Sequence, residues 1–186
     1  MNRVMDIFLS FTNKTHSTTF KFLSLIPGTI LFLVISPLFL FYFSRYISQF
    51  TPFFLPRTFE TFIAFSALLI AITLMTWGML SLWFDGKGTP APIAPTHTLV
   101  TTGPYKLCRN PIELGTDLYF LSLGTLLDTL TTGIFCMFLG MLLGYGYIKI
   151  IEERELKLRF GKKYEEYRDS TPLFIIQFFP KKDQDS

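Results

Sequence analysis

The sequence predicts an all-α integral membrane protein with about four transmembrane helices, of which the last two form a helical hairpin. Three observations lead to this fold class: a mean hydropathy of +0.39, a charged fraction of only 17%, and long apolar runs in a chain that holds 22 phenylalanines. Apolar residues gathered in this way are typical of bilayer-spanning helices. The pattern excludes a soluble enzyme and a disordered tail.

Charge and cysteine content exclude further classes. Seventeen basic and fourteen acidic residues give a net charge of +3, which is too mild for a nucleic-acid-binding protein. The two cysteines, Cys108 and Cys136, cannot build a disulfide framework or a zinc-ribbon site. We therefore expect neither a nucleic-acid partner nor a metal centre.

The first apolar run spans Phe20 to Ser44, with Lys21 at its edge. At about 1.5 Å per residue it reaches about 37 Å, enough to cross a bilayer with some tilt. Pro27 and Pro37 are expected to kink this helix. The alternative, a cleaved signal peptide, is disfavoured because no small-x-small cleavage site follows the run.

Three more runs complete the predicted helices. Thr58 to Phe84 is the cleanest, interrupted only by Glu60 near its start. Ile112 to Leu127 and Gly133 to Ile151 are separated by a short polar segment, and the earlier of the two reaches only about 24 Å. A tight hairpin with its turn near the far interface fits both lengths.

Charge asymmetry predicts the topology. Of the seventeen basic residues, only Arg45 and Arg57 fall on one side of the four predicted crossings. By the positive-inside rule the other fifteen face the cytoplasm, so both termini are expected there, in a bacterial inner membrane or the endoplasmic reticulum. The predicted organisation is a tail and two helices over residues 1–84, followed by a functional core over residues 85–186.

Two predicted cytoplasmic segments carry chemically informative residues. The loop Asp85 to Pro111 is rich in glycine and proline, which favours a stiff, shaped loop, either functional or a plain connector. The second segment begins where the last run leaves the membrane and contains Glu152 and Glu153. Considered alone, such a glutamate pair is more often a solvated helix face than a ligand site.

Three motifs carry a family resemblance. They are His97-x-Leu99-Val100-x-x-Gly103-Pro104-Tyr105, then Arg109-Asn110-Pro111-x-x-Leu114-Gly115, then Glu152-Glu153-x-x-Leu156 with Phe160-Gly161-x-x-Tyr164-x-x-Tyr167. In this order they resemble the isoprenylcysteine carboxyl methyltransferase family, whose superfamily includes membrane phospholipid methyltransferases. The resemblance covers about residues 86–172, nearly half of the chain.

The resemblance implies binding of S-adenosylmethionine at the cytoplasmic membrane surface. The implied cofactor-binding residues are His97, Leu99, Val100, Gly103, Pro104, Tyr105, Asn110, Pro111, Leu114, Gly115, Glu152 and Glu153. Their chemistry suits this cofactor, because carboxylates attract its ammonium group and an aromatic face suits adenine or a sulfonium. A lipid or prenylated substrate and membrane lipids are the implied partners, and the oligomeric state is left open.

Two departures from the family pattern bear on the substrate. Asn110 stands where the family often has His, and Glu113 stands where Tyr is common. Glu113 is expected either to pair with Arg109 or Lys106, or to contact the cofactor or an amine-bearing substrate.

The predicted catalytic residues depend on the methyl acceptor. A prenylcysteine-like carboxylate needs no base, and Arg109 or Arg154 would orient it; an amine-bearing lipid needs a base, for which Glu113 is the candidate. Two other readings stay open: an NADPH-dependent oxidoreductase of the steroid-reductase type, and a non-catalytic membrane interaction protein. The glutamate pair favours the methyltransferase, because phosphate-bearing cofactors prefer Arg and Lys.

Overall fold

The computed structural model describes residues 17–51 and 55–176, and every regular element in these two ranges is helical. The all-α prediction is therefore confirmed for the described chain. The predicted positions of the two termini fall outside these ranges. Two compact units emerge, each formed from separate stretches of sequence. The loop unit comprises residues 17–25, Trp77–Pro111 and 148–176, and the hairpin unit comprises Ile26–Thr76 and Ile112–Tyr147.

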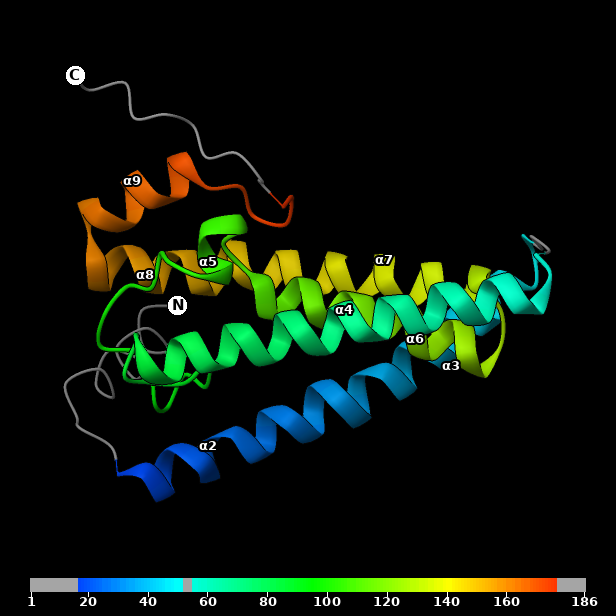
Figure 1. Cartoon of the computed structure of the whole chain (residues 1–186), viewed down its shortest axis with the longest axis horizontal. Helices are drawn as coiled ribbons and strands as arrows, with labels where there is room; N and C mark the ends of the chain where they lie inside the picture. The colour runs from blue at the N-terminus through cyan, green and yellow to red at the C-terminus, as the bar shows by residue number, and fades with distance from the viewer. Residues whose placement is uncertain (1–16, 52–54, 177–186) are drawn as a thin grey trace. The chain divides into compact units, whose positions relative to one another are not determined.

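Three helices of the described chain are long and apolar enough to cross a membrane (Figure 1). They cover Thr18–Ser48, Arg57–Phe84 and Leu130–Phe160. The first joins α2 (Thr18–Ile30) and α3 (Ser36–Ser48) through the π-helical segment Leu31–Ile35. The second is α4 (Arg57–Phe84). The third joins α7 (Leu130–Tyr147) and α8 (Glu153–Phe160) through the π-helical segment Ile148–Glu152.

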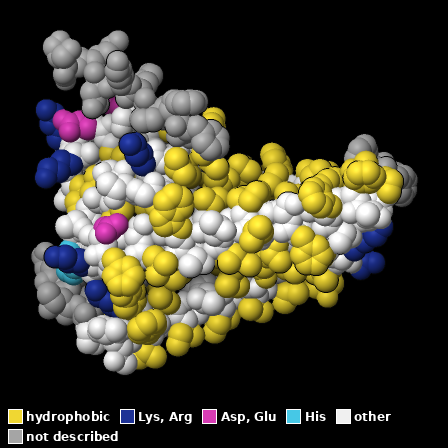
Figure 2. All heavy atoms as spheres, viewed as in Figure 1, with side chains coloured by type: hydrophobic (Ala, Val, Ile, Leu, Met, Phe, Trp, Pro, Cys, Tyr) yellow, Lys and Arg dark blue, Asp and Glu magenta, His cyan; other side chains and the backbone are white. Residues whose placement is uncertain are grey.

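The remaining predicted crossing forms α6 (Pro111–Leu127), a helix of 17 residues that is shorter than the three candidate spans. A count of four crossings therefore stays a prediction. Large apolar side chains stand exposed on the long helices, among them Phe39, Phe62 and Leu143, and Figure 2 shows how widely apolar side chains cover the visible face. Such surfaces suit contact with lipid, so the protein is a helical membrane protein.

The π-helical segment Leu31–Ile35 lies between Pro27 and Pro37 of the first long helix. Pro37 has no N–H to donate to Leu33, four residues earlier. The Leu33 carbonyl instead accepts a hydrogen bond of 3.0 Å from the Tyr119 hydroxyl on α6. The Ser36 N–H donates to Leu31, the wider spacing of a π turn. A side chain of a neighbouring helix thus replaces the backbone donor that proline removes.

Glycines bring α6 and α7 into close antiparallel contact. A Cβ atom at Gly124 would lie 2.8 Å from the Cα atom of Gly133, and one at Gly140 would lie 2.9 Å from Asp117 Oδ1. In the contacts 124/133, 117/140 and 113/144, the residue number falls along α6 as it rises along α7, as expected for antiparallel helices. This register defines the hairpin.

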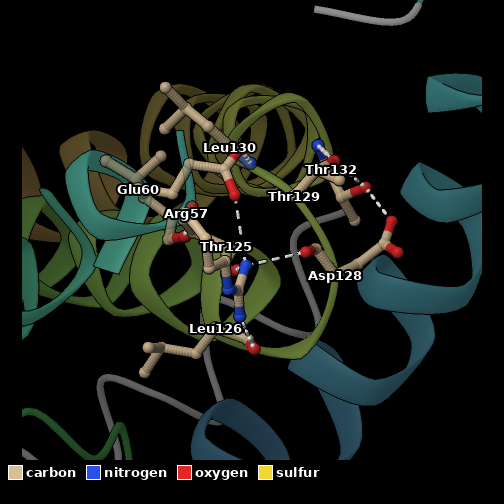
Figure 3. Close-up of polar contacts among 9 residues, drawn as sticks. Arg57, Glu60, Thr125, Leu126, Asp128, Thr129, Leu130 and Thr132 are labelled. Atoms are coloured by element: carbon tan, nitrogen blue, oxygen red, sulfur yellow. Dashed lines mark hydrogen bonds and ion pairs between the residues drawn. The ribbon is translucent and has the colours of Figure 1, made fainter. Parts of the chain in front are cut away.

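The hairpin turn is held by two side chains of α4 (Figure 3). The Arg57 guanidinium donates to the carbonyls of Thr125, Leu126 and Asp128 at 2.7–2.9 Å, which satisfies the C-terminal end of α6. Glu60 accepts the Leu130 N–H at 2.9 Å and so caps the first turn of α7. The turn of the hairpin is therefore held by two side chains that lie more than sixty residues earlier in the chain.

Candidate functional site

The loop that follows α4 folds back on itself. Gly86 packs so closely that a Cβ atom would lie 2.6 Å from the Leu82 carbonyl and 2.7 Å from Thr96 Cγ2. Gly88 meets the backbone of residues 95 and 96 in the same way. The His97 N–H then donates to the Gly86 carbonyl at 2.7 Å. Glycines are required here because two backbone segments share the space of a side chain.

A second close approach occurs where the loop enters α5 (Pro104–Leu107). Gly103 has a φ of 60°, a conformation that favours glycine. A Cβ atom there would lie 3.2 Å from Ser81 Oγ and 3.4 Å from Trp77 Nε1 of α4. The Gly-Pro pair of the first motif therefore fits the loop against the end of α4.

The tyrosines of the third motif form the core of the loop unit. Tyr164 and Tyr167 lie on α9 (Lys162–Ser170) and pack with Val100 and Tyr105. The Tyr167 hydroxyl donates to the Tyr105 carbonyl at 2.6 Å. These aromatic contacts join the first and third motifs, which are about sixty residues apart.

Arg109 is the hub between the second and third motifs. Its side chain is only 9% exposed, and Nη1 donates to Glu153 Oε1 at 2.8 Å and to the Tyr164 hydroxyl at 3.4 Å. Nε donates to the Thr171 carbonyl at 2.9 Å, and the Arg109 N–H donates to the Pro172 carbonyl at the same distance. The guanidinium thus binds both the acidic helix and the segment that follows α9.

Glu153 has two cationic partners. Its Oε1 accepts hydrogen bonds from Arg109 and, at 2.7 Å, from Lys149 Nζ one turn earlier. The side chain expected to attract a cofactor ammonium is therefore engaged by protein cations on that oxygen. The charge of Glu152 also acts on Tyr164, so this cluster contains two cations and two carboxylates.

A buried ion pair links α8 to the loop. Arg159 donates to Glu155 Oε1 at 2.8 Å and to the Thr96 carbonyl, and its guanidinium lies 4.8 Å from the Phe160 ring centre. The Arg159 side chain is only 5% exposed. The charges of this segment alternate in sign, which is typical of a solvated helix, but that interpretation is wrong for Glu155 and Arg159 because the loop covers this side of the helix. The i,i+4 spacing of Glu155 and Arg159 was the available signal.

Burial changes the acidity of the groups at this core. Burial raises the pKa of Tyr105 well above its usual value, with a smaller contribution from the charge of Glu152. Burial also raises the pKa of Tyr164 to about 12 and that of the Cys108 thiol to about 11. These groups stay protonated at neutral pH, so Cys108 is a packing residue and not a thiolate nucleophile.

The predicted site residues divide between the two units. The loop unit holds Arg154 and most of the expected cofactor residues. Of these, His97 and Arg154 are exposed, and Leu99, Asn110, Glu152 and Glu153 are half-buried. The buried ones are Val100, Pro104, Tyr105 and Pro111. The hairpin unit holds Glu113, Leu114 and Gly115. Gly115 lies against α4, where a Cβ atom would be 2.7 Å from Met75 Cγ. The functional roles of all these residues stay predictions.

The fold and the site together define a helical membrane protein in which ion pairs and hydrogen bonds hold a Pro/Gly loop against the glutamate-bearing helix α8. The family model for phospholipid methyltransferases matches residues 59–163, more than half of the chain, and the chain belongs to this family. The predicted resemblance is confirmed at the level of this superfamily. Membership indicates a methyltransferase in general terms, and members of the family generally use S-adenosylmethionine.

The comparison with curated proteins gives a distant relative. The cobalt-zinc-cadmium resistance protein CzcN of Cupriavidus metallidurans is 32% identical over 109 residues, an alignment that covers 58% of this chain and 46% of that protein. The matched region therefore spans about half the length of the relative. No solved structure matches the chain.

Proposed function

We propose that the protein is a membrane methyltransferase that uses S-adenosylmethionine to methylate the carboxylate of a prenylcysteine-like or other lipid substrate. The observation that carries the proposal is the Arg109–Glu153 ion pair, which joins the motifs of the loop to those of the acidic helix. The partner is a lipid or a prenylated molecule that enters from the bilayer, and the cofactor arrives from the cytoplasm.

The residues of the loop unit suit a zwitterionic cofactor. Lys149 supplies a positive charge for the cofactor carboxylate, and the half-buried Glu152 supplies a negative charge beside Tyr105. Leu99, Leu156 and Phe160 are half-buried against the aromatic core of this unit and offer an apolar surface for adenine. The cofactor supplies a methyl group on a sulfonium, whose transfer leaves a neutral thioether.

The role of the protein is then to orient the acceptor and exclude water. A carboxylate acceptor is already ionised at neutral pH, so no proton has to be removed. Arg109 binds Glu153 through Nη1 and Thr171 through Nε, which fixes the plane of its guanidinium. A guanidinium held in this way can present its remaining N–H groups to an acceptor carboxylate, with Arg154 as the second candidate for that role.

The test is to incubate the full-length protein, in lipid nanodiscs, with methyl-tritiated S-adenosylmethionine and either N-acetyl-S-farnesylcysteine or a total-lipid extract. A methyl ester releases its label as volatile methanol in base, whereas an N-methyl group does not. Arg109→Lys keeps the charge but loses the planar fork, so base-labile labelling should fall about 10- to 100-fold. Arg168→Lys, at an exposed pair with Asp169, is the matched control. Absence of any labelled species would contradict the proposal.

N-methylation of an amine-bearing lipid is the second candidate. It is favoured by Glu113, a half-buried carboxylate at the start of α6, which could accept the proton that an amine must lose. Base-stable labelling that Glu113→Gln abolishes would select this activity over the first.

A further inference from the structure

The residues that follow α9 return to the first turn of α8. The Arg109 guanidinium binds Glu153, the first residue of α8, and also the carbonyl of Thr171, the first residue after α9. Figure 1 shows this segment in red-orange, running away from the junction of α8 and α9. Residues 171–176, which we call the strap, therefore begin beside the end of α8 that continues from a candidate membrane span.

Two consecutive residues hold the strap by its backbone. The Arg109 N–H donates to the Pro172 carbonyl at 2.9 Å, and the Asn110 N–H donates to the Leu173 carbonyl at 3.3 Å. Arg109 Nε donates to the preceding carbonyl, that of Thr171, at 2.9 Å. Three successive strap carbonyls are thus bound directly before α6 begins. Movement of the strap would therefore release the same guanidinium that binds Glu153.

The strap presents apolar side chains beside this clamp. Leu173, Phe174 and Ile176 are half-buried, and Ile175 is 76% exposed. The strap contains no charged residue, in contrast to α8 and α9. Ile150, three residues before Glu153 on the long helix, is also 60% exposed. Exposed aliphatic side chains at this level suit the boundary between lipid headgroups and acyl chains, where apolar area is removed from water.

We propose that the strap inserts its apolar side chains into the headgroup region of the lipid bilayer, and that this contact holds Arg109 where it binds Glu153. The partner is the membrane surface and not a second protein, because the strap is anchored beside a helix long and apolar enough to cross a membrane. The position of Arg109 then depends on the membrane. The inference does not rest on the proposed methyl transfer, because both of its tests work without a methyl donor.

The first measurement places residue 175 relative to the bilayer. The full chain, in a Cys108→Ala/Cys136→Ala background, carries a nitroxide at Ile175→Cys in nanodiscs of phosphatidylcholine and phosphatidylglycerol. The ratio of collisions with oxygen, which enters lipid, to collisions with a water-soluble nickel chelate should be at least about threefold higher than at Lys162→Cys, an exposed position of α9. Preferential access of nickel would overturn the proposal. Low access of both reagents would also overturn it, because protein would then cover the strap.

The second measurement tests the link to Arg109 in the chain with its native cysteines. Ile175→Glu places a charge that anionic lipid repels, so hydrogen exchange at the Arg109 and Asn110 N–H groups should quicken at least about fivefold in the same nanodiscs. Ile175→Leu keeps the apolar contact and should exchange like the wild type. In amphipol, which lacks lipid headgroups, the difference between Ile175→Glu and the wild type should shrink below about twofold. Unchanged exchange in Ile175→Glu, or an equal difference in amphipol, would overturn the membrane-dependent role.

Discussion

The Tyr119 hydroxyl donates to the Leu33 carbonyl, the acceptor that Pro37 leaves without a backbone donor. Tyr119→Phe should therefore destabilise the protein by about 1 kcal/mol, since a half-buried acceptor loses the donor that replaces the backbone N–H. In a Pro37→Ala background the residue at position 37 can donate to Leu33 again, so the same substitution should cost less. Unfolding in mixed detergent micelles measures both values. Tyr42→Phe, at an exposed phenol on α3, is the control, and equal costs in both backgrounds would refute the link to proline.

The buried Glu155–Arg159 pair should hold the loop in place. Glu155→Gln leaves the Arg159 guanidinium enclosed without its counter-charge, which should cost about 3 kcal/mol. Because Arg159 also donates to the Thr96 carbonyl, Arg159→Met should speed amide exchange at the neighbouring His97 N–H. Hydrogen exchange followed by mass spectrometry measures this effect. Glu166→Gln, at an exposed ion pair of α9, serves as the control, and unchanged loop exchange in Arg159→Met would refute the role.

The raised pKa of Cys108 predicts a loss of stability in base. The folded thiol titrates at about 11, above its unfolded value near 9, so the folded state holds the proton more tightly. The resulting stabilisation is complete below the unfolded pKa and is lost as pH rises through the folded one. Thermal unfolding between pH 8 and 11, in a Cys136→Ala background, should show a fall in midpoint that Cys108→Ala reduces. An identical pH profile for both proteins would contradict the assignment.

Glu153 anchors both Arg109 and Lys149, and Glu153→Gln should abolish methyl transfer while membrane insertion is retained. The amide can still accept one hydrogen bond, but it no longer fixes the two cations by charge. Tritium labelling and a membrane-fraction assay measure the two properties. Glu165→Gln, at an exposed partner of Lys157, is the control. Full activity of Glu153→Gln would exclude it from the site.

The helices were largely predictable from sequence because apolar runs of bilayer length report on local structure. The run Thr58 to Phe84 matches α4 to within one residue. The turn of the hairpin was less predictable, because Arg57 and Glu60 cap its two helices from α4. In the same way, the helical pattern around Glu155 could not reveal which face the loop would cover. The local periodicity of apolar residues does not predict long-range contacts of this kind.

The candidate site was predictable where glycine and proline set the backbone. Gly103 has a positive φ and packs closely against α4, as glycine allows, and Tyr167 contacts Tyr105 across the loop unit. The Arg109 partner of Glu153 was not foreseen, because it lies 44 residues away and nothing in its local sequence selects that carboxylate. The sequence could not show that Asp117 has no hydrogen-bond partner within residues 17–51 and 55–176, because this depends on the enclosing helices.

The antiparallel register of α6 and α7 gives the short turn between them a second consequence. Because each residue rotates a helix by about 100°, inserting one amino acid near Asp128 would swing Asp117 and Glu113 away from Gly140 and Gly144 and bring bulkier side chains into that narrow space. The length of the turn between α6 and α7 therefore determines which side chains face Gly140 and Gly144 in the rest of the hairpin.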